Sequence, residues 1–529
     1  MAHKLKNVFK KIDEHLGGNP EPLPPSQNIP PAPQFPPFDP ITSEMYRHRK
    51  QVGVNLGSLF CLEGWLAPPA LKSSGLRHDW DSEIDYLEAC ESRETARSSL
   101  EEHWKNFVTE QDFAFLANAG INAVRLPVGY WAVADKEDLA GPFKKFQGVY
   151  DAAWNYIFII IHNAAKHNIG VLVDLHGAPG GQNCDSHCGS STGQAQLFST
   201  LGSHNESLTR KILLKLANAL APINNVIGLE LLNEPQDDSA LSNFYLETIR
   251  QIRQATPNIR LPIYIGDAWN VDKYSELLAK HQTELDFCVL DTHQYFCHMP
   301  ADHAKTAEQH TKHLTTGLKS KLAAASQRIR GNMVVGEWAV VLNGKSIPKG
   351  QHDGQVMKDF GRAELQVWNE TCAGQFYWTY KTADDGWYWS LVYCLKNHII
   401  DQPVPGGGFI NVNNDVIGSI QNKKEATMQG AYNSHVQYWS QQENGKNVVD
   451  NAWRFQQGYQ KGYDVALRFV EGFKSRVGFV GQLAHEYAQQ HCNQDQNKQD
   501  ASANAWQFEH GFCQAVITVN QELQQAGAF

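Results

Sequence analysis

The chain has little of what marks a membrane or secreted protein. Its 529 residues contain no apolar run long enough to span a bilayer. The first eleven residues have neither the apolar core nor the small-residue cleavage site that is typical of a secretory signal. The sequence therefore predicts a cytoplasmic location.

Cysteine is sparse and charge is evenly spread. The ten cysteines are scattered, which argues against a disulfide framework and predicts free thiols. The formal net charge is −10 without a block of like charge, so we expect no nucleic-acid partner. Aromatic residues are plentiful, with 14 Trp, 18 Tyr and 24 Phe, which suits a carbohydrate site, although large cores also contain aromatic side chains.

Residues 1–45 form an amino-terminal extension. Leu5, Val8, Phe9, Ile12 and Leu16 recur at helical spacing among lysines, which predicts a short basic amphipathic helix. Such a helix either docks on the protein's own surface or makes weak contact with a membrane surface. Residues 19–40 hold ten prolines and are expected to form an extended tether.

Residues 46–403 alternate between strand and helix patterns, which predicts a (β/α)8 TIM barrel, a fold of the α/β class. Amphipathic helical stretches at 101–119, 150–167, 208–220 and 241–255 lie between apolar runs. The eight expected strands are 52–56, 122–128, 170–175, 226–232, 262–267, 287–292, 333–338 and 375–380.

Residues 404–529 are expected to hold the final barrel helix and a helical carboxy-terminal extension. The sequence Asn-Ala-Trp-Arg-Phe at 451–455 is echoed by Asn-Ala-Trp-Gln-Phe at 504–508. The spacing predicts a helical hairpin that buries Trp453, Phe455, Trp506 and Phe508 and packs on the barrel or on a second copy of the chain, giving a homo-oligomer.

Two apolar runs end in a carboxylate. Leu-Leu-Asn-Glu-Pro at 231–235 places Glu234 at the end of the fourth expected strand, and Val-Val-Gly-Glu-Trp at 334–338 places Glu337 at the end of the seventh. Two facing carboxylates are what glycoside hydrolysis needs. The alternative is that each Glu is a solvated strand cap.

The chain resembles glycoside hydrolase family 5, in particular its fungal exo-β-1,3-glucanase branch, over about residues 50–400. The motifs that carry the resemblance are Gly-Val-Asn-Leu-Gly at 53–57, Leu-Glu-Gly-Trp at 62–65, His-Trp at 103–104, Arg-Leu-Pro-Val-Gly-Tyr-Trp at 125–131, Asp-Leu-His-Gly-Ala-Pro-Gly-Gly-Gln-Asn at 174–183, Asn-Glu-Pro at 233–235, Asp-Thr-His-Gln-Tyr at 291–295, Gly-Glu-Trp at 336–338 and Phe-Tyr-Trp-Thr-Tyr-Lys at 376–381.

The resemblance implies retaining hydrolysis of terminal β-glucosyl residues without a cofactor or a metal. Glu234 would be the acid/base and Glu337 the nucleophile. Seven further residues would bind the substrate: Asn233 at the sugar 2-hydroxyl, Arg125 and Tyr295 against Glu337, His176 and His293 around the terminal glucose, Trp378 beneath it, and Glu63 at its distal hydroxyls. The alternative for Arg125 is a structural ion pair, and for the histidines an ordinary core position.

Two loops depart from the family pattern. Where the secreted exo-glucanases place two Phe rings that clamp the leaving sugar, this chain has Asp185 and His298, although Phe296 is nearby. The same loops contain Cys184, His187, Cys188 and Cys297, for which zinc binding, a disulfide or free thiols are the alternatives.

The leading prediction is therefore a retaining exo-acting β-glucosidase of the glucan 1,3-β-glucosidase type. The first alternative keeps the mechanism but takes glucolipids or small-aglycone glucosides. The second is a non-catalytic carbohydrate-binding scaffold.

Overall fold

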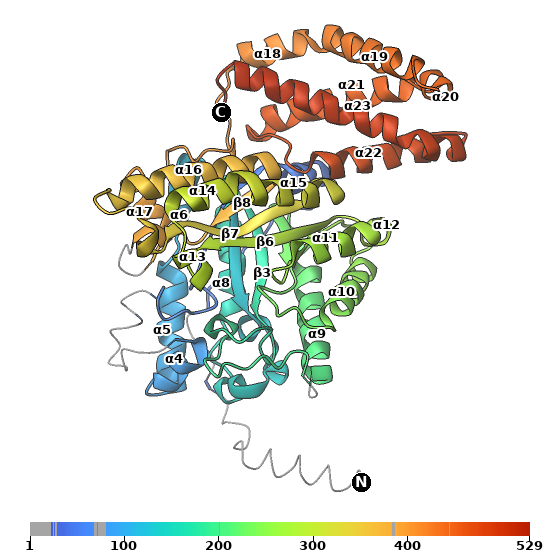
Figure 1. The fold of residues 1–529 in the computed structure, drawn as a ribbon. Helices are drawn as coiled ribbons and strands as arrows, with labels where there is room; N and C mark the ends of the chain where they lie inside the picture. The colour runs from blue at the N-terminus through green and yellow to red at the C-terminus, as the bar shows by residue number, and fades with distance from the viewer. Residues whose placement is uncertain are drawn as a thin grey trace.

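The structure is a computed structural model that describes residues 23–24, 26, 29–67, 71, 81–199, 202–382, 387–443 and 445–529. Eight parallel strands close into a barrel in chain order, with β8 paired to β1, so the predicted TIM barrel is confirmed (Figure 1). The strands are β1 Gln51–Asn55, β2 Ala123–Gly129, β3 Gly170–Gly177, β4 Val226–Glu230, β5 Ile263–Gly266, β6 Cys288–Phe296, β7 Met333–Leu342 and β8 Gly374–Tyr377.

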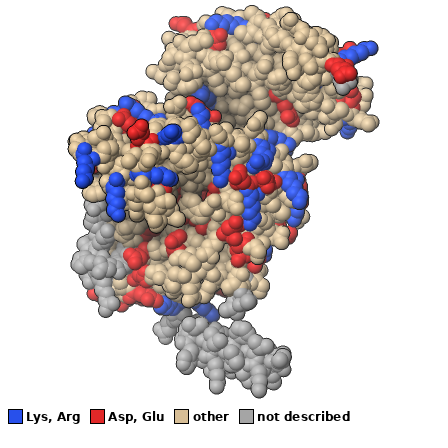
Figure 2. Space-filling view, viewed as in Figure 1, with Lys and Arg blue, Asp and Glu red and all other residues tan. Residues whose placement is uncertain are grey.

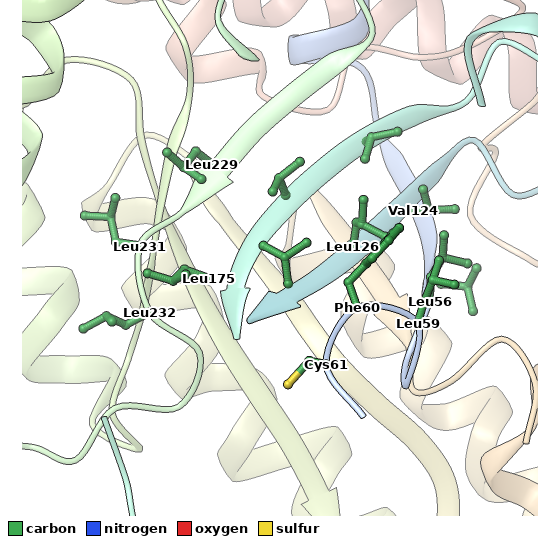
Figure 3. Packing of buried hydrophobic residues seen from close by; sticks show 14 of the residues in the cluster. Leu56, Leu59, Phe60, Cys61, Val124, Leu126, Leu175, Leu229, Leu231 and Leu232 are labelled. Atoms are coloured by element: carbon green, nitrogen blue, oxygen red, sulfur yellow. The ribbon is translucent and has the colours of Figure 1, made fainter. Parts of the chain in front are cut away.

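The strands are buried on both faces because the barrel interior covers one face and the helices cover the other. Every residue of β1 to β5 is buried. Figure 3 shows leucines of β2, β3 and β4, among them Leu126, Leu175 and Leu229, in one apolar cluster. This packing fixes the strand ends, from which the side chains of the site project.

Helices surround the barrel between the strands (Figure 1). Their bounds are α2 Pro40–His48, α4 Glu83–Ala89, α5 Arg93–Asn106, α6 Glu110–Asn118, α7 Tyr130–Val133, α8 Ala153–Lys166, α9 Gly202–Leu220, α10 Leu241–Ala255, α11 Val271–Lys280, α12 Gln282–Leu285, α13 Pro300–His303, α14 Ala307–His313, α15 Lys319–Arg328, α16 Asp353–Thr371 and α17 Leu391–Lys396.

The single helix expected over 101–119 is two helices. The chain breaks between α5 and α6, where the Asp112 carboxylate accepts hydrogen bonds from the Thr109 backbone N–H and hydroxyl, each at 2.7 Å. This side chain satisfies a backbone donor at the start of α6, as a capping residue does. The apolar period continues across the break, so the sequence pattern alone did not reveal it.

The carboxy-terminal extension is helical, as predicted, but it is larger than a hairpin. It has an apolar core of its own around α21 and α23, separate from the barrel core. Its helices are α18 Asn414–Asn422, α19 Lys424–Ser440, α20 Lys446–Asp450, α21 Trp453–Phe473, α22 Val480–Gln494 and α23 Lys498–Gln525. Figure 2 shows that the visible face of this unit carries few charged side chains.

The two similar segments, 451–455 and 504–508, lie near the point where α21 and α23 cross. A Cβ on Gly458 would lie 2.0 Å from the carbonyl oxygen of Phe508, and a Cβ on Gly511 would lie 2.0 Å from that of Phe455, so only glycine permits this close approach. Both Phe side chains are buried. The predicted burial of the two tryptophans is wrong: Trp453 is 38% exposed and Trp506 is 37% exposed. Residues two apart on a helix point about 200° apart, so burying each Phe turns its Trp outward.

The carboxy-terminal unit packs at the amino-terminal mouth of the barrel. Ala123, Val289 and Val334, at the first or second positions of their strands, share a buried cluster with Tyr46 of α2 and with Phe479. The ring of Phe479 lies 5.3 Å from that of Phe287. Chain segments more than 400 residues apart also pair directly, because Arg49 forms a β-bridge with Val477.

The predicted amphipathic helix at 5–16 lies outside the described residues. No helix in the described part of the chain combines the length and the hydropathy that a bilayer crossing requires.

Candidate active site

The site lies at the carboxyl ends of the strands, where a TIM barrel carries its chemistry. A cavity of about 990 Å³ opens there and brings together most of the predicted site residues. Its lining consists of Glu63, Trp65, His176, Asp185, Ser186, His187, Asn233, Glu234, Trp269, Tyr295, His298, Met299, Asp302, Glu337, Trp378 and Trp389. Arg125 and His293 stand directly behind the two glutamates.

Arg125 of β2 is fully buried and is the centre of the charge network. Its guanidinium donates to Glu337 Oε1 at 2.9 Å, to Glu230 Oε2 at 2.7 Å and to Asn233 Oδ1 at 2.8 Å, and lies 3.1 Å from Asp174. Burial alone lowers the pKa of Arg125, but these carboxylates raise it well above its usual range. The structural ion pair and the contact with Glu337 are therefore both present.

Glu337, in β7, is held at both oxygens. Arg125 donates to Oε1, and the Tyr295 hydroxyl donates to Oε2 at 2.8 Å. Burial raises the pKa of this carboxyl group, while His293, Arg125 and the bond from Tyr295 oppose the rise. The carboxylate thus has the partners that favour its ionised form and fix its orientation.

Glu234, just after β4, has different surroundings. Its Oε1 lies 2.7 Å from His293 Nδ1 and its Oε2 lies 3.8 Å from His187 Nε2. Burial is the largest cause that raises its pKa, and Asp185 adds to the rise. Its backbone is in the left-handed region, with φ 42°, immediately before Pro235, which is a strained conformation for a non-glycine residue.

The two carboxyl groups face each other closely. One oxygen of Glu234 and one of Glu337 lie within 4.8 Å of each other, with His293 between them. This bound is close to the about 5–5.5 Å between the carboxyl groups of retaining glycosidases and well below the ~6.5–9.5 Å of inverting ones.

Two buried polar nitrogens at the cavity have no protein partner. Among the described residues, His176 Nε2 and Asn233 Nδ2 are buried without a hydrogen bond. Asp174 accepts from the other nitrogen of His176, at 2.7 Å, and the Trp378 ring is stacked against the imidazole at a centroid distance of 5.7 Å. Burial lowers the pKa of His176 well below its usual range, so the ring is neutral and its Nε2 is an acceptor, whereas Asn233 Nδ2 is a donor. The floor therefore offers one donor and one acceptor, which suits a hydroxylated ligand.

Glu63 lies at one end of the cavity beneath Trp65, whose indole N–H donates to its carboxyl at 3.0 Å. Burial raises the pKa of Glu63 to about 8. Three further tryptophans, Trp65, Trp269 and Trp389, line the cavity and were not predicted as site residues. Each follows a strand in the sequence, but tryptophans in a large core have the same pattern.

The two loops that depart from the family pattern do meet at the cavity. Asp185 and His298 both line it, and the His298 ring stacks on Trp389 at 5.8 Å. Phe296 does not supply the missing ring, because it is buried against Phe360. All ten cysteines are free, and no cluster of potential metal ligands in the described ranges includes a cysteine, which favours free thiols for Cys184, Cys188 and Cys297.

A closed barrel whose strand ends present two facing carboxyl groups in one cavity has the architecture of a glycoside hydrolase. A model of the cellulase domain, glycosyl hydrolase family 5, matches residues 90–384, and a model of the glucan 1,3-beta-glucosidase 3 C-terminal domain matches residues 420–523. The chain belongs to glycosyl hydrolase family 5.

The relatives cover nearly the whole chain. It is 29% identical to glucan 1,3-beta-glucosidase 3 of Schizosaccharomyces pombe over 88% of this chain and 94% of that protein. It is 30% identical to an uncharacterized glycosyl hydrolase of Saccharomyces cerevisiae over 98% of this chain and 100% of that protein. The fold is similar to that of a rutinosidase from Aspergillus niger, with a TM-score of 0.53 at 21% identity, over 67% of this chain and 98% of that one.

Proposed function

We propose that the chain is a retaining, exo-acting β-glucosidase, with Glu337 as the nucleophile and Glu234 as the acid/base. The observation that carries this assignment is the pair of carboxyl groups within 4.8 Å of each other in opposite surroundings. Arg125 and Tyr295 hold Glu337 at both oxygens, whereas neither of them donates to Glu234. Burial raises the pKa of both carboxyl groups, so these contacts, and not the pKa values, carry the division of roles.

The reaction then has two displacements. The ionised Glu337 attacks the anomeric carbon of the terminal glucose while Glu234 gives its proton to the glycosidic oxygen, so the aglycone leaves as an alcohol and the glucosyl group is bound to Glu337. Glu234, now ionised, takes a proton from water, whose oxygen attacks the same carbon and releases Glu337. The product has the β configuration of the substrate.

The remaining predicted residues bind the glucose. The free amide donor of Asn233 and the free Nε2 acceptor of His176 suit its hydroxyl groups, and the Trp378 ring suits its apolar face. Glu63 and Trp65 line the same cavity and are joined by a hydrogen bond, and the proposed contact of Glu63 with the distal hydroxyls of the glucose favours cleavage at a chain end.

The relatives' names suggest a terminal β-1,3-linked glucosyl residue as substrate, but the leaving-group side lacks the Phe clamp. We expect clear activity on aryl β-glucosides and weak activity on long β-1,3-glucans. The test is kcat/KM for β-1,3-glucan oligomers of increasing length, with an aryl β-glucoside as reference. A steady rise in efficiency with chain length would contradict the proposed leaving-group side.

A glucolipid or a glucoside of a small apolar aglycone is the second candidate. It is favoured by Trp269 and Met299, which line the cavity and are 60% and 64% exposed. A glucolipid in detergent, assayed beside the oligomers, separates the two candidates. If the protein hydrolyses no β-glucoside, the remaining candidate is the non-catalytic carbohydrate-binding scaffold.

We also propose a cytoplasmic site of action, which the ten free thiols support because disulfides are rare in that compartment. Weak membrane contact through residues 1–45 and self-association through the carboxy-terminal unit remain predictions. Cell fractionation and sedimentation of the purified protein test them.

A further inference from the structure

His187 is a residue of the site that the mechanism does not use. It lies in the loop after β3, within a single 3-10 turn, Ser186–Cys188, and lines the same cavity as both glutamates. Its ring is 15% exposed, and its centroid is 5.2 Å from that of His176. The other two histidines of the cavity floor contact a carboxylate directly, whereas His187 contacts an amide.

That amide, Asn183, fixes the protonation of His187. Asn183 Oδ1 must be the oxygen because it accepts from the Asp185 backbone N–H at 2.9 Å, and Nδ2 must be the nitrogen because it donates to the Glu234 carbonyl at 2.8 Å. The same Nδ2 lies 2.9 Å from His187 Nε2. Since Nδ2 can only donate, Nε2 must accept, and the imidazole is neutral with its proton on Nδ1.

The Nδ1–H of His187 is left for a ligand. It has no hydrogen-bond partner among the described residues, although the ring lines the cavity. Burial lowers the pKa of His187 to about 4, which agrees with a neutral ring at neutral pH.

The position of His187 places that donor on the leaving-group side. An acid that protonates the glycosidic oxygen must lie against the leaving group, and His187 Nε2 is 3.8 Å from Glu234 Oε2. The loops after β3 and β5 flank the end of β4 in the closed barrel, so His187 stands on one side of Glu234 and the exposed Trp269 on the other.

We propose that His187 is a specificity-determining residue that donates its Nδ1–H to an oxygen of the leaving group next to the glycosidic bond. The leaving group that it selects is a hydroxylated ring, as in a β-linked disaccharide, which also offers an apolar face to Trp269. This inference rests on the proposed function and names the class of substrate. A neutral donor serves the role because it adds no positive charge beside the acid.

The experiment is a double-mutant cycle in which one change is made in the enzyme and the other in the substrate. Initial rates give kcat/KM for β-linked glucose disaccharides and for analogues that lack single hydroxyls on the leaving ring. The enzymes are the wild type, His187→Leu, which removes the donor, and His187→Asn, whose amide nitrogen occupies the place of Nδ1. His352→Leu, an exposed histidine whose side chain is 86% accessible, is the matched control.

We expect one deoxy analogue to lose about five- to tenfold in the wild type, the effect of one neutral hydrogen bond. In His187→Leu, kcat/KM for this analogue should equal kcat/KM for the parent disaccharide, because the donor is gone. In His187→Asn, the analogue should again have the lower kcat/KM. If His187→Leu does not fold, His187→Phe, which also removes the donor, takes its place in the comparison.

Equal losses in His187→Leu on the parent disaccharide and on every analogue would overturn the inference, since a merely structural role acts on all substrates alike. So would the absence of any penalty for a deoxy analogue in an active wild type. Failure of the wild type to cleave any β-glucoside would instead contradict the proposed function, and the two failures are therefore distinct.

Discussion

The floor of the cavity and its rim are built in different ways. On the floor, Arg125, Asn233 and Glu337 are at most 5% exposed, and Arg125 binds both of the others. On the rim, Trp269 and Met299 are 60% or more exposed. Removing one member of a buried charge network leaves its partners uncompensated, whereas a rim side chain is free to change. The reaction is therefore fixed by the floor, and the choice of leaving group is left to the rim.

The largest effect should come from Glu337→Gln on the floor. This change keeps the shape but removes the nucleophile, so kcat should fall by at least about 10⁴-fold on every β-glucoside. Initial rates measure the loss, and a thermal melt close to that of the wild type is the control for folding. Residual activity within tenfold of the wild type would remove Glu337 from the proposed role.

Glu234→Ala should show a loss that depends on the leaving group. General acid catalysis is worth about 10²–10⁴-fold for a poor leaving group, so disaccharides should lose that much. An aryl glucoside with an acidic phenol needs little proton donation and should lose far less in the first step. Added azide should restore turnover and give a β-glucosyl azide. Equal losses on both substrates without an azide product would contradict the division of roles between the two glutamates.

His298→Phe tests whether the rim sets substrate choice. His298 already stacks on Trp389, so a Phe ring should keep its place and add an apolar face without a polar edge. An aromatic contact of this kind is worth about 0.5–1.5 kcal/mol, so kcat/KM for β-1,3-glucan oligomers should rise about two- to tenfold relative to an aryl glucoside. An equal change in kcat/KM for the oligomers and for the aryl glucoside would show that the loop after β6 does not contact the leaving sugar.

Asp185→Asn should have the smallest effect, seen in the pH profile. Asp185 raises the pKa of Glu234, because its negative charge disfavours a second one nearby. Without that charge the pKa of Glu234 falls, a smaller fraction is protonated at a given pH, and the basic limb of kcat/KM moves to lower pH. Asp185 is exposed, so the shift should be small and should shrink further in high salt. A shift of the basic limb to higher pH would contradict this electrostatic account.

The sequence predicted the barrel because its strands are short apolar runs separated by helical patterns, and it placed Glu234 at the end of the fourth strand and Glu337 at the end of the seventh. It missed the break at Thr109, where a side-chain cap interrupts an apolar period that continues through it. It also missed Trp269, whose place in the cavity depends on a left-handed backbone, with φ 62°, that no local pattern announces. Periodicity reports burial, whereas these features depend on a side-chain cap and on a backbone dihedral, neither of which changes the apolar pattern.

The buried cluster that joins Phe479 to the amino-terminal mouth of the barrel has a consequence for shortened clones. The family 5 match ends at residue 384, which invites a clone that stops soon after β8. Such a clone would retain every strand and both carboxyl groups, yet its Phe287 ring would lose the Phe479 ring and keep that of His48. Arg49 would lose Val477, its partner in the β-bridge. An expression boundary drawn at the end of the catalytic match therefore exposes the underside of the barrel to water, and a clone meant for enzymology should extend through α23.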